Sequence, residues 1–190
     1  METTLKALIA SHSGNLPAIG APGRDCLTYE GLRNLTREVA EALNEMGIDA
    51  AGRVAIVLPN GPEMASAFIT VAQAATTAPL NPAYKEEEYI FYLEDLSAKA
   101  LILRDGDNGP AYAAATKLGM NIIRLSVPDG AAAGYFTLSG DTSAAHADRA
   151  PSAGDVALIL HTSGTTSRPK IVPLLHSNVA ASAQHIRTSL

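Results

Sequence analysis

Five short strand candidates constrain the fold of this chain more than any other feature of its sequence. They span residues 53–58, 77–80, 100–103, 121–127 and 156–160. Most of their residues are apolar, and segments of this length and composition predict buried β-strands. Helices are expected between them, over 62–75, from Glu86 onward and over 109–118. This alternation predicts an α/β fold, a layered domain with a mostly parallel sheet flanked by helices.

The segments outside this alternation are predicted from local signals. Residues 5–10 end a short amphipathic helix, and two extended stretches around Gly20–Gly23 predict a hairpin. A helix is expected over 29–46, with Thr28 as its N-cap. Residues 128–154 are rich in Ala, Gly, Ser and Asp and predict a surface connection with at most one short strand. A final helix is expected from Asn178, capped by Ser177.

The bulk composition excludes several classes of protein. Of the 190 residues, 47% are apolar and 17% are charged, which is enough for a substantial core and argues against disorder. A net charge of −5 without a basic stripe argues against a nucleic-acid partner. The single cysteine, Cys26, excludes an internal disulfide framework. No run approaches the roughly 20 apolar residues of a membrane span, so we expect a cytoplasmic protein.

Hydroxyl and cationic side chains are most concentrated directly after the last apolar run, between Thr162 and Lys170. Residues 162–167 carry five hydroxyl side chains and one glycine, and Arg168 and Lys170 add two positive charges. Hydroxyls, accessible backbone N–H groups and a nearby cation are what a polyphosphate requires. The stretch therefore predicts a phosphate-binding loop.

This loop differs from the common nucleotide and hydrolase motifs. Counted from Gly164, the Walker A pattern requires glycine where Pro169 stands, and Lys170 is followed by Ile171 instead of Ser or Thr. Residues 171–174 predict a second strand, so the arrangement is strand, loop, strand. The GxGxxG and GxSxG patterns are also missing. His161 and His176 flank the loop, but two histidines at this spacing make a poor metal site, so structural or edge-of-site roles are favoured.

The stretch TSGTTSRPK, followed by Leu174-Leu175-His176-Ser177-Asn178, resembles the signature of the adenylate-forming enzymes, the superfamily of AMP-dependent synthetases and ligases that includes acyl-CoA synthetases. Three upstream blocks resemble the same family in the same order: 29–32, 54–60 and 78–89. Within the family, the loop is most similar to that of oxalate–CoA ligases. The resemblance covers most of the chain.

The resemblance implies an ATP-dependent acid–CoA ligase, with a small-molecule carboxylic acid, ATP, Mg²⁺ and coenzyme A as its partners. A carboxylate and ATP would give an acyl-adenylate and pyrophosphate, and coenzyme A would then displace AMP. By the same resemblance, the ATP phosphates are bound by Thr162, Ser163, Gly164, Thr165, Thr166, Ser167 and Lys170. Ser167 and Ile171 stand where the family commonly has glycine. The two departures leave open whether the loop closes as it does in the family.

The resemblance also implies that the family's catalytic lysine and C-terminal domain lie beyond Leu190. We therefore expect residues 1–190 to be an incomplete N-terminal domain that contains no catalytic residue and has no activity of its own. Two alternatives remain at the level of sequence. One is a non-catalytic nucleotide-binding relative, for which Ile171 is the main support. The other is an ordinary solvent-exposed loop in which Arg168 and Lys170 are solvated and bind no ligand.

Overall fold

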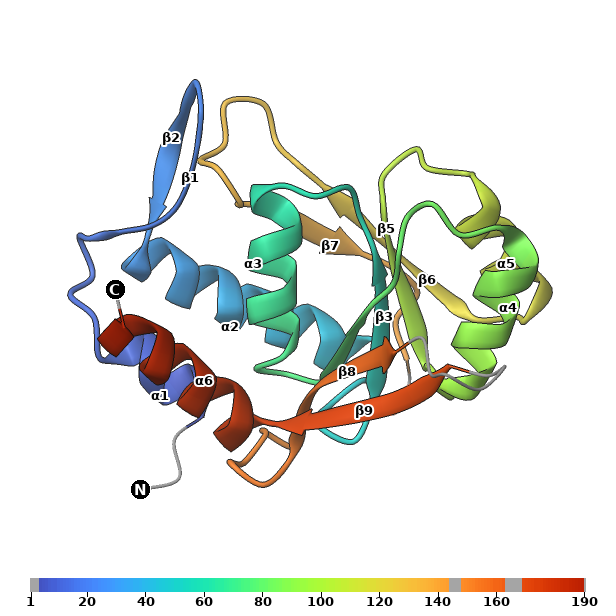
Figure 1. The fold of residues 1–190 in the computed structure, drawn as a ribbon. Helices are drawn as coiled ribbons and strands as arrows, with labels where there is room; N and C mark the ends of the chain where they lie inside the picture. The colour runs from blue at the N-terminus through green and yellow to red at the C-terminus, as the bar shows by residue number, and fades with distance from the viewer. Residues whose placement is uncertain (1–3, 144–147, 163–168, 190) are drawn as a thin grey trace.

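The chain folds around one seven-stranded sheet (Figure 1). The computed structural model describes residues 4–143, 148–162 and 169–189. The strand order is β7-β6-β5-β3-β4-β8-β9, and the five strands from β6 to β8 are parallel. Strands β7 and β9 pair antiparallel with β6 and β8 at the two edges. The predicted α/β architecture with a mostly parallel sheet is confirmed.

The helices and strands follow the predicted alternation. In chain order they are α1 (Leu5–Ala10), β1 (Pro17–Ala21), β2 (Arg24–Thr28), α2 (Tyr29–Glu45), β3 (Arg53–Val57), α3 (Pro62–Val71), β4 (Thr76–Pro79), α4 (Glu86–Asp95), β5 (Ala100–Arg104), α5 (Pro110–Lys117), β6 (Asn121–Ser126), β7 (Thr137–Ser139), β8 (Val156–Thr162), β9 (Lys170–Leu175) and α6 (His176–Ser189). Strands β1 and β2 form the predicted hairpin, separate from the main sheet.

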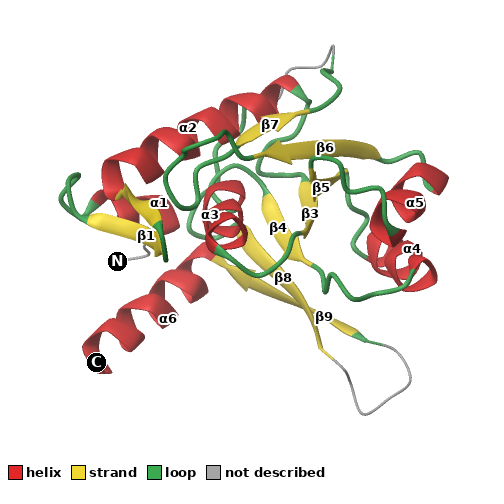
Figure 2. Cartoon of the chain, turned by 90° about the horizontal axis from the view of Figure 1, so that it is seen from above, coloured by secondary structure: helices red, strands yellow, loops and turns green. Residues whose placement is uncertain are grey.

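Helices cover both faces of the parallel strands because successive side chains of a strand point to opposite faces. In β3, Val54 and Ile56 enter one core with α2 and α3, whereas Ala55 and Val57 enter a second core with α4 and α5. Figure 2 shows these helix pairs on opposite sides of the sheet. A strand buried on both faces has no polar side, which is why these strands are continuous apolar runs in the sequence.

Local signals fix helix α2 as predicted. The Thr28 hydroxyl accepts a hydrogen bond from the backbone N–H of Gly31 at 3.1 Å, which satisfies one of the free donors of the first turn. The apolar residues at helical spacing face the sheet and are buried: Leu32, Leu35, Val39 and Leu43. The helix therefore packs as its periodicity indicates.

Two helix boundaries differ from the prediction by more than one residue. Helix α3 ends at Val71 because residues 72–75 turn back through short-range hydrogen bonds, such as Ala74 N–H to Val71 O at 2.9 Å, and lead into β4. Helix α6 begins at His176, before the predicted Asn178. The side chain of Asn178 accepts a hydrogen bond from the backbone N–H of Leu175 at 2.9 Å, as the third residue of a capping box does.

Part of the segment 128–154, predicted as a surface connection, belongs to the core. Ala133 and Phe136 are 0% and 1% exposed, and Phe136 packs with residues of α2, α3 and the sheet. The short strand β7 then pairs with β6. Composition indicated a surface segment because small and polar residues surround one short apolar island, in which Tyr135, Phe136 and Leu138 all pack against the core.

The first and last helices pack side by side, as Figure 1 shows. A small cluster of Leu5, Ala72, Ala157 and the partly buried Val179 lies between them and the sheet. Small residues on the sheet side allow the helices to approach closely. The helix that follows β9 is thereby fixed to the rest of the domain.

Replacing Phe136 tests whether the connection is part of the core. We expect Phe136→Ala to lower the free energy of unfolding by about 3–5 kcal/mol, because it removes a fully buried aromatic ring and leaves a cavity. Its exposed neighbour is the matched control, and Thr137→Ala is expected to change stability by less than about 0.5 kcal/mol. Urea unfolding followed by circular dichroism measures both. Equal effects of the two substitutions would contradict the burial of this segment.

Candidate functional site

The hairpin of β8 and β9 brings the two described ends of the predicted loop together. In its antiparallel register, Thr162 pairs with Lys170 and His161 with Ile171. Directly opposed residues of an antiparallel pair place their side chains on the same face, with Cβ atoms about 5 Å apart. Both Thr162 and Lys170 are exposed. A hydroxyl and an ammonium group thus stand side by side on one face of the hairpin.

The other predicted phosphate-binding residues lie outside the described residues. They are Ser163, Gly164, Thr165, Thr166 and Ser167. Of the predicted set, the structure therefore places Thr162 and Lys170. The two strands predicted on either side of the loop are confirmed as β8 and β9.

The catalytic lysine is predicted beyond the C-terminal end of the described residues. Helix α6 is described as far as Ser189, and Leu190, beyond which the resemblance places that lysine, lies outside the described residues. The position of a catalytic lysine relative to Thr162 and Lys170 therefore stays a prediction.

The parallel strands bring the loop to an edge where other loops meet. Strand β8 runs parallel to β4, with Thr77 opposite Leu158, so Thr162 lies at the carboxyl end of the sheet. The turn that begins at Asn81 leaves the same edge after β4. Open α/β sheets bind ligands in the crevice outside the carboxyl ends of their strands. The hairpin therefore carries the predicted loop at the edge of the sheet where this class of fold binds small molecules.

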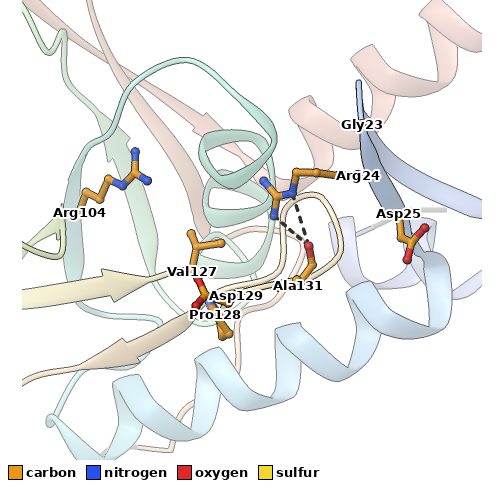
Figure 3. A pocket seen from close by; sticks show the side chains of 9 residues that line it. Gly23, Arg24, Asp25, Arg104, Val127, Pro128, Asp129 and Ala131 are labelled. Carbon is orange, nitrogen blue, oxygen red and sulfur yellow. Dashed lines mark hydrogen bonds between the residues drawn. The ribbon is translucent and has the colours of Figure 1, made fainter.

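Two neighbouring cavities open at this edge, farther along the sheet. One of about 300 Å³ lies between the ends of β3, β5 and β6, and one of about 460 Å³ is shown in Figure 3. Arg104 lines both cavities. Arg24 donates a hydrogen bond to Glu63 at 2.6 Å and another to the carbonyl of Ala132 at 2.9 Å. Because Asp25 and Asp129 also line the larger cavity, its walls carry both signs of charge.

The Arg24–Glu63 pair joins the hairpin of β1 and β2 to the start of α3. Burial alone would raise the pKa of Glu63, but hydrogen bonds from Arg24 and from backbone N–H groups, including that of Gly134, outweigh it and lower the pKa. Both side chains keep part of their surface exposed, so the pair contributes modestly to stability. Spacing in the sequence does not signal this contact, because the partners are 39 residues apart.

His161 points to the face of the hairpin opposite Thr162. Its Nε2 lies 3.2 Å from Asp95 Oδ2 at the end of α4, and its ring meets that of Tyr92 edge to face at 4.7 Å. The side chain is 5% exposed. Asp95 was not a candidate in the sequence, which offers no spacing signal for a partner on a different element.

Ile171 has a regular place in the hairpin. Its side chain packs against the core between the sheet and α4, on the same face as His161. A β-branched residue suits a pleated, half-buried strand position. The departure from the family's glycine is therefore accommodated by packing at the start of β9.

His176 occupies a buried position at the start of α6. It is 1% exposed, and neither ring nitrogen has a hydrogen-bond partner within the described residues. Burial lowers the pKa of His176, and the nearby Asp155 opposes the shift only in part. The described residues contain no group of three or more histidine, cysteine, aspartate or glutamate side chains that could hold a metal ion. The burial of His176 favours a structural role, which is one of the two roles that the sequence left open.

Asp155 closes the turn that precedes β8. It accepts hydrogen bonds from Arg149 at 3.1 Å and from both the backbone and the hydroxyl of Ser152 at 2.7 and 2.8 Å. The hydrogen bond from Arg149 is the main reason that the pKa of Asp155 falls to about 2. The Asp155 carbonyl also accepts the backbone N–H of His176 at 3.0 Å. This turn therefore ties the start of β8 to the start of α6.

Comparison with known proteins agrees with this geometry. The solved structure of ATP-bound MatB from Rhodopseudomonas palustris superimposes with a TM-score of 0.75 at 27% identity, over 98% of this chain and 37% of MatB. The fold is that of the N-terminal domain of adenylate-forming enzymes. A family model described as AMP-binding enzyme matches residues 8–189, and the chain therefore belongs to the AMP-binding enzyme family.

The similar curated proteins include several that are named as CoA ligases. The chain is 38% identical to the oxalate–CoA ligase of Arabidopsis thaliana and 37% identical to a probable CoA ligase of Humulus lupulus, over 97% and 98% of its own length. It spans only 37% and 36% of the length of these relatives. None of the described helices is long and apolar enough to cross a membrane.

The buried His176 makes stability depend on pH. Because its folded-state pKa is lowered, the unfolded chain binds the proton first as the pH falls, so stability declines below the ordinary histidine pKa of about 6.5. We expect His176→Phe to weaken this decline between pH 7 and pH 5, measured by thermal unfolding. The exposed His185 supplies the control, and His185→Phe should leave the decline intact. An identical pH profile for His176→Phe and the wild type would contradict the assignment.

Proposed function

We propose that the chain forms the ATP-phosphate side of the site of an acid–CoA ligase. The observation that carries the proposal is the pairing of Thr162 with Lys170 at the carboxyl edge of the parallel sheet. A hydroxyl donor and a fixed positive charge on one face are suited to adjacent phosphate oxygens. Membership of the AMP-binding enzyme family supports the same assignment.

The proposed reaction has two steps. In the first, a carboxylate oxygen bonds to the α-phosphorus of ATP as the bond to the bridging oxygen breaks, which gives an acyl-adenylate and pyrophosphate. In the second, the thiol of coenzyme A attacks the acyl carbon, loses its proton and releases AMP. The loop residues act in the first step, where negative charge builds on the departing pyrophosphate. They are Thr162, Ser163, Gly164, Thr165, Thr166, Ser167 and Lys170.

Their contribution is electrostatic. Preorganised donors that face a developing charge lower the barrier without forming a covalent bond to the substrate. Mg²⁺ would enter as the counter-ion of ATP, since protein sites for this ion commonly rely on substrate phosphates. The described residues contain no group of three or more histidine, cysteine, aspartate or glutamate side chains that could hold it. We further propose that the family's catalytic lysine lies beyond Leu190, so that residues 1–190 supply binding groups and no complete activity.

A small dicarboxylic acid is the proposed substrate. Its support is the loop sequence TSGTTSRPK together with the identity to proteins named oxalate–CoA ligase in Arabidopsis thaliana and Saccharomyces cerevisiae, 38% and 36%. Residues beyond those in this chain would complete the pocket for the acid.

The alternative is a non-catalytic nucleotide-binding relative. Ile171 was its main support in the sequence, and its side chain packs regularly between β9 and the core. No other described feature favours this alternative over a ligase. Pyrophosphate exchange distinguishes the ligase from the non-catalytic relative, because only a ligase exchanges pyrophosphate into ATP.

Carboxylate-dependent exchange of labelled pyrophosphate into ATP tests the proposal. The chain would replace the matching N-terminal part of the Arabidopsis thaliana oxalate–CoA ligase, and oxalate, malonate and acetate would be compared as substrates. We expect exchange with oxalate, and Lys170→Ala should lower its kcat about 100-fold, as the loss of one preorganised donor does elsewhere. Lys99→Ala is the matched control, because Lys99 is exposed and precedes β5 at the opposite edge of the sheet.

Two outcomes would contradict the proposal. If ATP binds but none of the acids supports exchange, the chain belongs to a non-catalytic relative. If Lys170→Ala and Lys99→Ala behave alike, Lys170 does not contact the phosphates.

A further inference from the structure

The contact between Asp95 and His161 links helix α4 to the strand that delivers Thr162. His161 is the residue directly before Thr162, and strand alternation turns the two side chains to opposite faces. While Thr162 is exposed, the side chain of His161 is only 5% exposed and reaches Asp95 Oδ2 at 3.2 Å from its Nε2. The side chain of Asp95 is 37% exposed, so the pair lies at the border between core and solvent.

A ladder of aromatic rings extends this link to a second loop. The ring of Tyr92 meets His161 edge to face at 4.7 Å, and Tyr84 stacks on Tyr92 with a centroid distance of 4.8 Å. A hydrogen bond with Tyr84 is the main reason that the pKa of Tyr92 rises to about 12. Tyr84 belongs to the turn after β4, and its backbone N–H donates to the carbonyl of Asn81 at 3.2 Å. Helix α4 therefore contacts both the turn that follows β4 and the last residues of β8.

Stability alone does not account for a histidine at this position. The Nδ1 atom of His161 is buried and has no hydrogen-bond partner within the described residues. A buried nitrogen without a partner costs free energy that a phenylalanine ring in the same place would not. The feature that a phenylalanine would lose is the directional contact from Nε2 to Asp95.

We propose that Asp95 and His161 are positioning residues for the polyphosphate site. Their contact fixes the rotation of the last residues of β8, and through the register it keeps Thr162 opposite Lys170. A displacement of about 1 Å at a site of this kind can cost on the order of 100-fold in rate or affinity. The inference rests on the proposed function, because it assumes that Thr162 and Lys170 meet phosphates.

Binding of polyphosphate to the 190-residue chain tests this role. The probes are inorganic tripolyphosphate and MgATP, titrated by calorimetry, with adenosine as the negative control. His161→Phe keeps a planar ring and removes the contact with Asp95, so we expect the Kd for tripolyphosphate to rise about 10-fold while the Tm stays equal or rises. His161→Gln keeps an N–H donor near the position of Nε2, and it should restore the Kd to within about threefold of the wild type.

Variants of Asp95, the partner of His161, provide the second part of the binding test. Asp95→Ala should raise the Kd as His161→Phe does, and the double variant should bind no more weakly than either single one, because both remove the same contact. Glu94→Ala is the matched control, since Glu94 is an exposed carboxylate one residue earlier on α4 and should leave the Kd unchanged.

The outcomes separate this inference from the proposed function. If Lys170→Ala weakens binding and His161→Phe does not, the positioning role is wrong and the phosphate site stands. The positioning role is also wrong if His161→Phe raises the Kd together with a fall in Tm and His161→Gln does not restore the Kd. His161 would then have a structural role. If tripolyphosphate and MgATP do not bind to the wild-type chain, or bind equally well after Lys170→Ala, the proposed function fails and this inference fails with it.

Discussion

The parallel pairing of five strands is the constraint on which the rest of this structure depends. Parallel neighbours cannot be joined by a tight turn, so each connection must cross the sheet, and most of them do so as a helix. Two consequences follow together. Helices cover both faces, and the segment after every parallel strand leaves from the same edge. Residues as distant in sequence as Asn81 and Thr162 are thereby brought to one side of the molecule.

The hairpin of β8 and β9 is antiparallel, unlike the parallel strands beside it, and it places polar groups at this edge. Its antiparallel return extends β8 beyond the parallel sheet, since β4 pairs with it only at Leu158. The register then sets a hydroxyl opposite an ammonium group and turns His161 toward α4. At the end of β8, Thr162 thus lies on the exposed face, and His161 lies on the face that contacts α4.

The sequence predicted most of the fold because its signals are local. Buried parallel strands are continuous apolar runs, and the Thr28 cap lies within three residues of the N–H that it satisfies. The errors arose where distant contacts decide. Phe136 is buried by α2, α3 and the sheet, and α3 stops early because the chain must turn into β4. The same limit applies to the site. Thr162 and Lys170 share one motif, whereas Asp95 and His161 are 66 residues apart and no periodicity connects them.

The packing of α1 against α6 has a consequence for the order in which the domain assembles. Leu5 and Val179 belong to one small cluster, although almost the whole chain separates them. Bringing these two residues together closes a longer loop, and so costs more conformational entropy, than pairing neighbouring strands does. Few apolar groups are buried in the cluster to offset this cost. We therefore expect this cluster to be among the last parts of the domain to form and among the first to open locally. Because α6 follows β9 without a break, each such opening releases one side of the strand that carries Lys170.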